Sequence, residues 1–197
     1  MEAFATASRC RSPRSSGDSD RPSQRGPAGG SHVAETRGHQ TGAVEITRAD
    51  FDDPRLAAFL RAHLDDLAPT APPESRHALD LAALRGDGVR LWVGTDDGAI
   101  VGTAALAALG DGHEELKSMR TEPRVRGTGV ASRLLAHALA DARARGVGRV
   151  SLETGSMEFF APARRFYARA GFVPCPPFAS YADDPLSCFM TLVLAPG

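Results

Sequence analysis

The sequence predicts a single domain of mixed α/β class, and three observations support this fold class. Helix-type and strand-type patterns are interleaved along the chain in the order β-α-α-β-β-β-α-β-α-β. The early strands are separated by short turns, whereas helices separate the later ones. Apolar residues make up 42% of the chain and charged residues 24%, which is the range of a globular protein with a core. We assign this domain to residues 43–197.

Residues 1–42 have a different composition and are expected to form a disordered tail. The stretch 11–30 consists mainly of Arg, Ser, Gly and Pro. Such a segment buries too little apolar surface to offset the entropy cost of ordering it. A functional extension and a misassigned start site both remain open for this tail.

The first elements of the domain are a strand and two helices. Residues 44–47 alternate apolar and polar side chains, as in a half-buried strand. A helix opens at Asp52-Asp-Pro-Arg, where a capping residue precedes a first-turn proline. The prolines at 69–73 end it, and residues 74–85 form a second predicted helix. The apolar face of the first helix consists of Leu56, Phe59, Leu60, Leu64 and Leu67.

A hairpin and a further strand come next. Strands are predicted at 89–94 and 99–109, and Asp96-Asp97-Gly98 is the turn between them. Residues 114–121 form the next strand, and a basic loop that contains glycine follows it. The chain order therefore places these strands side by side in one sheet.

An amphipathic helix is predicted at 127–146, with strands at 148–154 and 188–194 and a short helix at 162–170 that Gly171 ends. The apolar residues of the long helix recur at helical spacing and define its buried face. They are Val130, Leu134, Leu135, Ala138, Leu139 and Ala142.

Composition argues against several functional classes. The net charge is −1, so the chain lacks the strongly basic face of nucleic-acid binders. It has no apolar run of about 18–20 residues and no compact secretory signal, so we expect no membrane partner and a cytoplasmic protein. Cys10, Cys175 and Cys188 have no zinc-type spacing, which argues against a metal site.

The segment Arg124-Val-Arg-Gly-Thr-Gly, between a strand and the long helix, indicates an anion site. Helix N-termini expose unpaired N–H groups, and glycine lets an anion approach the backbone closely. A Walker loop requires a lysine that this segment lacks. A dinucleotide-binding fingerprint is nearly met, but Ser132 replaces its third glycine, and it normally opens the first βα unit. The remaining interpretation is the pattern R-x-x-G-x-G.

That pattern is the pyrophosphate loop of the GNAT acetyltransferase superfamily, which the domain resembles over about residues 44–194. Four features occur in the family's order, which makes the resemblance more specific than one glycine motif. They are the strand Glu115-Leu-Lys-Ser-Met-Arg, the loop and helix of 124–135, the strand Ser151-Leu-Glu-Thr-Gly, and the helix of 163–172. The end Pro185-Leu-Ser-Cys-Phe-Met also resembles a bacterial subgroup that includes small-molecule acetyltransferases.

The resemblance implies a mostly antiparallel sheet that is splayed between the strands 114–121 and 148–154, flanked by helices, with acetyl-CoA in the gap. The backbone of Met119, Arg120 and Thr121 would pair with the pantetheine arm. The pyrophosphate would be held by the loop residues Arg124, Arg126, Gly127, Thr128, Gly129, Val130, Ala131 and Ser132. Many family members carry an asparagine seven residues before the helix tyrosine, where this chain has Phe160. Contacts of that asparagine are therefore not expected here.

Acetyl transfer to an amine requires a neutral amine and a proton for the departing thiolate. At pH 7 only about one in 10³ molecules of an amine with a pKa of about 10.4 is neutral, so a carboxylate base would help. We nominate Tyr167, which matches the family's helix tyrosine, as the acid, and Glu153 and Glu115, which flank the expected splay, as candidate bases. Core packing for the tyrosine, and an exposed or ion-paired role for each glutamate, are the alternatives. The loop that follows Tyr181 could overhang the acceptor pocket or be a solvated turn.

These features predict an acetyl-CoA-dependent N-acetyltransferase that needs no metal and acts as a monomer or homodimer. Its acceptor would be the primary amine of a small molecule or of an amino-acid-like compound. A non-catalytic acyl-CoA-binding module is one alternative, and a dinucleotide-binding protein is another.

Overall fold

The computed structural model describes residues 44–67 and 81–195, without the side chains of 63–67 and 81. The predicted tail and most of the predicted helix 74–85 lie outside this part. Its strands are β1 (Glu45–Arg48), β2 (Val89–Asp96), β3 (Ala99–Gly110), β4 (His113–Thr121), β5 (Arg149–Gly155), β6 (Val173–Pro174) and β7 (Ser187–Val193). Its α-helices are α1 (Pro54–Leu67), α2 (Leu81–Leu84), α3 (Val130–Ala144) and α4 (Ala161–Arg169). The mixed α/β class predicted from the sequence is confirmed.

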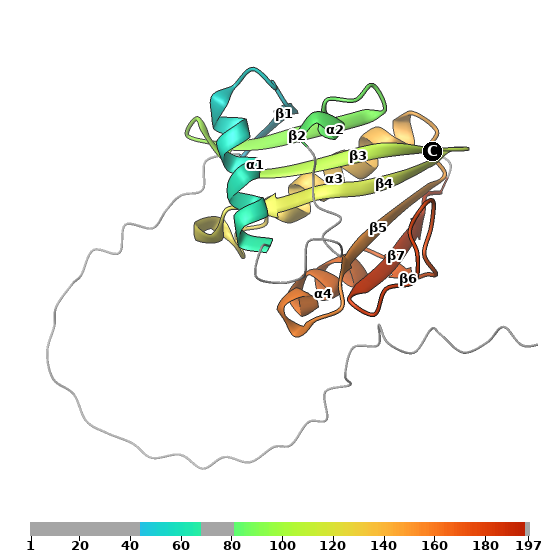
Figure 1. Ribbon diagram of the computed structural model, residues 1–197. Helices are drawn as coiled ribbons and strands as arrows, with labels where there is room; N and C mark the ends of the chain where they lie inside the picture. Colours follow the sequence, from blue (N-terminus) through green and yellow to red (C-terminus); the bar gives the residue numbers. More distant parts are fainter. Residues whose placement is uncertain (1–43, 68–80, 196–197) are drawn as a thin grey trace, which may run out of the picture.

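The described strands form one sheet in the order β1-β2-β3-β4-β5-β7-β6, with helices on both faces (Figure 1). Leu56 and Leu60 of α1 pack with Leu91 and Ala105 of the sheet in a small core on one face. The larger core, on the other face, lies beneath α3 and α4. It includes all six apolar residues that periodicity assigned to the long helix: Val130, Leu134, Leu135, Ala138, Leu139 and Ala142.

The joint between β4 and β5 is the feature that positions the site. Neighbouring strands are antiparallel everywhere in the described sheet except here, where β4 and β5 run parallel. Only three residue pairs join them, from His113–Arg149 to Glu115–Ser151. Beyond this joint the two strands diverge, as Figure 1 shows. The splayed sheet that the resemblance implied is therefore present.

Helix α3 lies very close to β3 because Gly102 has no side chain. A Cβ built at Gly102 would stand 2.7 Å from Cδ1 of Leu134 and 3.0 Å from the backbone oxygen of Arg120. Both distances are shorter than packed atoms normally allow, so a larger residue would push the helix away. This contact fixes the start of α3 beside the end of β4.

The boundaries of several elements differ from the sequence prediction. Helix α3 begins at Val130 and not at residue 127, because Gly127 and Gly129 have φ angles of +82° and +89°, which an α-helix does not accept. The two-residue strand β6 was not predicted, and the alternation of so short a segment carries no signal. In the described part, no helix is long and apolar enough to span a membrane.

Candidate active site

Strand β4 contains a β-bulge just beyond the point where it leaves β5. Thr103 of β3 faces Arg120, but Ala105 faces Lys117, so β4 has one extra residue in this interval. Ser118 adopts a φ of +55°, and its carbonyl accepts a 2.7 Å hydrogen bond from the Thr103 hydroxyl. The bulge re-aims the β4 backbone at Met119 and Arg120, on the strand that borders the gap. This is the segment proposed from the sequence to pair with a cofactor.

The loop between β4 and α3 presents several backbone N–H groups at the helix N-terminus. Within the described residues, the N–H groups of Arg126 and Thr128 donate to Pro123 and Val125, so the turn itself uses them. The structure thus narrows the expected cradle, which included both groups. In the same part of the chain, no acceptor is found for the N–H groups of Gly127, Gly129, Val130, Ala131 and Ser132.

Space for an anion exists directly above this loop. A Cβ built at Gly127 or at Gly129 would meet no atom within 4 Å, and both glycines are exposed. Arg124 and Arg126 are exposed as well, so their guanidinium groups can reach an anion there. The Thr128 hydroxyl donates a 2.7 Å hydrogen bond to the Val125 carbonyl, and its proton therefore serves the loop. The residues present fit a phosphate-bearing ligand.

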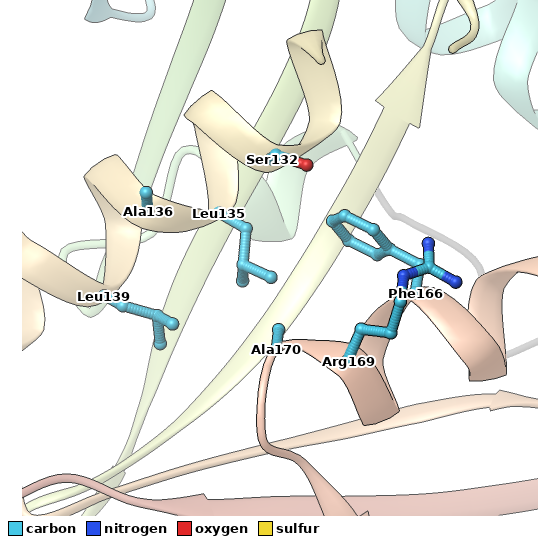
Figure 2. A pocket seen from close by; sticks show the side chains of 7 residues that line it. All are labelled: Ser132, Leu135, Ala136, Leu139, Phe166, Arg169 and Ala170. Carbon is cyan, nitrogen blue, oxygen red and sulfur yellow. The ribbon is translucent and has the colours of Figure 1, made fainter.

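A cavity of about 290 Å³ lies between α3 and α4 and shares Ser132 with the loop (Figure 2). Leu135 and Leu139 of α3 and Phe166 of α4 supply apolar walls, and Arg169 adds a cation. A long ligand held at the loop by a phosphate can therefore bury an apolar part against these two helices.

Tyr167 lies in the core beneath α4 and is only 8% exposed. Its ring packs against those of Phe166 and Phe172, with centroid distances of 5.3 and 5.8 Å. Burial, and secondarily the charge of Glu153, raise the pKa of Tyr167 above its ordinary value of 10.0. The hydroxyl therefore keeps its proton at neutral pH, as a proton donor must.

Glu115 and Glu153 lie on one face of the sheet, on the two strands that diverge. Glu115 pairs with Ser151, and Glu153 follows two positions later, so the pleat points all three side chains the same way. The Glu153 carboxylate accepts a 2.7 Å hydrogen bond from the Ser187 hydroxyl. The neighbouring Glu114 faces the other side, where its carboxylate is paired with the Arg145 guanidinium at the end of α3. The predicted pair is thus brought to the gap, and Glu114 is not.

Sequence reasoning missed two residues that bind Glu115. The Tyr181 hydroxyl donates a 2.6 Å hydrogen bond to Oε1 of Glu115, and Lys117 Nζ lies 3.0 Å from Oε2. Tyr181 belongs to the loop that was expected to overhang the acceptor pocket, and Lys117 is the only lysine in the chain. Those two facts were the available signals. Asp183 and Asp184, which follow Tyr181, are exposed or half-buried at the loop surface.

His113 does not join the two carboxylates as a metal ligand or base. Its Nε2 lies 2.8 Å from the Ser151 hydroxyl, and its ring packs against Phe178. Burial lowers the pKa of His113, so the imidazole is neutral near pH 7. Within the described residues, no group of three or more His, Cys, Asp and Glu side chains is arranged to hold a metal ion.

Phe160, which departs from the family pattern, fills space at the end of β5. A Cβ built at Gly155 would stand 2.1 Å from Cδ2 of the Phe160 ring, so the ring occupies the volume that any other residue at 155 would need. Arg164 donates hydrogen bonds to the carbonyls of Gly155 and Met157 from the same turn. In this chain, packing of Phe160 and polar contacts of Arg164 fix the start of α4.

The two tyrosines should make the folded protein less stable in alkaline solution. The pKa of Tyr181 is raised by burial and by its hydrogen bond to Glu115, and that of Tyr167 chiefly by burial. Because the folded pKa values exceed the unfolded value of about 10, this stabilisation is complete below pH 10 and is lost as the pH rises further. We expect urea midpoints to fall between pH 9.5 and about 11. The decline should be smaller in the double variant Tyr167→Phe, Tyr181→Phe, and an identical decline would contradict this explanation.

Comparisons with known proteins agree with this geometry. The sequence model of the acetyltransferase (GNAT) family matches residues 56–172. The uncharacterized N-acetyltransferase YsnE of Bacillus subtilis is 42% identical over 148 residues, which cover 75% of this chain and 98% of YsnE. YedL of Escherichia coli K12, also an uncharacterized N-acetyltransferase, is 41% identical over 76% of this chain and 94% of YedL.

The fold is shared with the PaiA N-acetyltransferase of Thermoplasma acidophilum, whose structure was solved in complex with coenzyme A. The TM-score is 0.62 at 16% identity, over 78% of this chain and 100% of that one. The family match and the relatives exclude the dinucleotide-binding alternative and support an acyltransferase enzyme. The chain therefore belongs to the acetyltransferase (GNAT) family.

Proposed function

We propose that this protein transfers the acetyl group of acetyl-CoA to the primary amine of a small molecule or of an amino-acid-like compound. The observation that carries this proposal is the joint of three residue pairs between β4 and β5, with an anion-binding helix N-terminus at its open end. Both candidate carboxylates and Tyr167 lie around this opening. No comparison identifies the acceptor, so its class rests on these residues.

The cofactor site we propose combines the loop, the β4 edge and the cavity between α3 and α4. The N–H groups of Gly127, Gly129 and 130–132, together with Arg124 and Arg126, would hold the pyrophosphate. The β4 backbone from Met119 to Thr121 would pair with the pantetheine arm, because β4 has no partner strand on that side beyond Glu115. When bound, acetyl-CoA supplies an acetyl group activated as a thioester.

We assign the proton transfers to Tyr167 and to one of the two carboxylates. A carboxylate, Glu153 or Glu115, accepts a proton from the acceptor ammonium and leaves a neutral amine. Tyr167 donates to the departing sulfur. Because burial raises the pKa of Tyr167, we expect its proton to move late, after the sulfur carries most of its negative charge. Overall, an N–C bond forms, a C–S bond breaks, and the proton lost by the amine is balanced by the thiol.

The test is a screen of free-thiol release from acetyl-CoA across matched pairs of amines. Each pair consists of an amino acid and the corresponding amine without the carboxylate, with an alcohol of similar shape as a control. We expect thiol release that depends on the amine and yields an N-acetyl product by mass spectrometry. Binding of acetyl-CoA without turnover of any amine would favour the non-catalytic module instead.

A further inference from the structure

The hydrogen bond between Tyr181 and Glu115 crosses the gap in the sheet. Glu115 is the last residue of β4 that pairs with β5, whereas Tyr181 lies 66 positions later, in the segment between β6 and β7. Strand β7 pairs with β5 and not with β4. The 2.6 Å bond therefore ties the β1–β4 half of the sheet to the β5–β7 half by side chains, just where the backbone ladder stops.

The Tyr181 ring is held in place for this bond. It packs against Phe178 and Phe189 with centroid distances of 5.2 and 5.4 Å. Phe189 sits on β7 opposite Glu153, so this aromatic group stands on the strands that carry the second carboxylate. The charge of Glu153 also contributes to the raised pKa of Tyr181, which places the two side chains in one electrostatic environment.

Both oxygens of Glu115 are engaged in this arrangement. Oε1 accepts from Tyr181 and Oε2 from Lys117, and the Glu115 side chain is only 7% exposed. Lys117 also brings a positive charge to 3.0 Å from the carboxylate. Taking up a proton at Glu115 would weaken two hydrogen bonds, one of them to a cation. Such a carboxylate is suited to holding its neighbours in place.

We propose that Tyr181 is a positioning residue of the acceptor site, which acts through Glu115, and that Glu153 is the carboxylate that takes the proton of the amine. In this arrangement Tyr181 and Glu115 together form a fixed wall across the gap on the face where both glutamates lie. The wall sets where the acceptor amine can stand relative to Glu153. The inference rests on the proposed function and chooses between the two bases that it leaves open.

The first test separates acceptor binding from cofactor binding. Tyr181→Phe keeps the ring but removes the donor, and a hydrogen bond to a charged group corresponds to about 10- to 100-fold. We expect kcat/KM for the amine to fall by that factor, mainly through KM, with the Kd of acetyl-CoA within about twofold of the wild-type value. Lys117→Met, which leaves the aromatic contacts intact, should shift the same parameter in the same direction. Unchanged acceptor kinetics in a folded Tyr181→Phe protein would overturn the positioning role.

The pH dependence of kcat identifies the base. If Glu153 takes the proton, the acidic limb of the kcat profile disappears in Glu153→Gln and persists in Glu115→Gln. The opposite result would make Glu115 the base and overturn the assignment. A wild-type protein that turns over no amine would contradict the proposed function itself, which is a different outcome from an active enzyme that is insensitive to Tyr181→Phe.

A spectroscopic readout tests the bridge without any turnover. Tyr167→Phe leaves Tyr181 as the only tyrosine, so tyrosinate absorbance reports on it alone. Adding Glu115→Gln keeps an oxygen acceptor but removes the negative charge. Tyrosinate should then form at a pH lower by about 1–3, before the circular dichroism signal of unfolding. Equal tyrosinate formation in both proteins before unfolding would show that Tyr181 does not face Glu115 in solution.

Discussion

Gly129→Glu is expected to abolish the stabilisation of the protein by acetyl-CoA. The substitution places a negative side chain in the open space above the helix N-terminus, where we propose that the pyrophosphate binds. At about 100 times its Kd, a ligand stabilises the folded state by about 2.7 kcal/mol, which is a rise in Tm of about 5–10 °C for a domain of this size. The wild-type protein should show this rise in a thermal shift experiment, and the variant should show none.

Gly110→Glu is the matched control for the strain that any side chain causes at positive φ. Gly110 has a φ of +94°, close to the +89° of Gly129, and a Cβ there also meets nothing within 4 Å. It lies at the turn between β3 and β4, at the end of β4 where the strands are still paired. Both variants should melt below the wild type without ligand, but only Gly110→Glu should regain stability with acetyl-CoA. A full response of Gly129→Glu would show that the loop assignment is wrong.

Tyr167→Phe is expected to lower turnover by about 10- to 10³-fold while leaving acetyl-CoA affinity nearly unchanged. The change keeps the packing against Phe166 and Phe172 and removes only the proton donor. Steady-state kinetics with the best amine of the screen, together with calorimetric titration of acetyl-CoA, measure the two quantities. A variant with wild-type turnover would reduce Tyr167 to a core residue.

The dependence on the leaving group distinguishes loss of the proton donor from a packing defect. A thioester whose thiol is more acidic needs less help from Tyr167, so the variant should recover part of its rate with such a substrate. Tyr181→Phe serves as the control, since it removes the other phenol but should respond to the leaving group as the wild type does. Equal recovery in both variants would contradict a specific role of Tyr167 at the sulfur.

Local patterns in the sequence were sufficient to predict those parts of the fold that depend on local structure. The six buried residues of α3 recur at helical spacing, so the buried face could be predicted without knowing what covers it. Gly127 and Gly129 were assigned to the anion loop for their freedom to adopt positive φ, and the structure shows that conformation. The same property ends the helix at its N-terminal side, which the apolar pattern did not reveal.

The contacts that define the candidate site join distant parts of the chain. The hydrogen bond from Tyr181 to Glu115 depends on the pairing of β5 with β7, and the lone tyrosine in its loop carries no periodic signal. The bulge at Ser118 is equally silent, because its positive φ occurs in a residue without the conformational freedom of glycine. Periodicity gives the face of a strand, but not the partner that a side chain meets across a gap.

The joint of three residue pairs between β4 and β5 has a consequence for the order in which the chain folds. Strands β2, β3 and β4 follow one another through tight turns, so their contacts close short loops. Strand β5 must instead find β7, with α4 and a long segment between them, and it meets β4 only after the crossover through α3. Short loops cost less entropy to close, so we expect the β2–β4 meander to form early and the β5–β7 half to dock late. Amide hydrogens of β5 and β7 should then exchange through partial openings that leave β2–β4 protected.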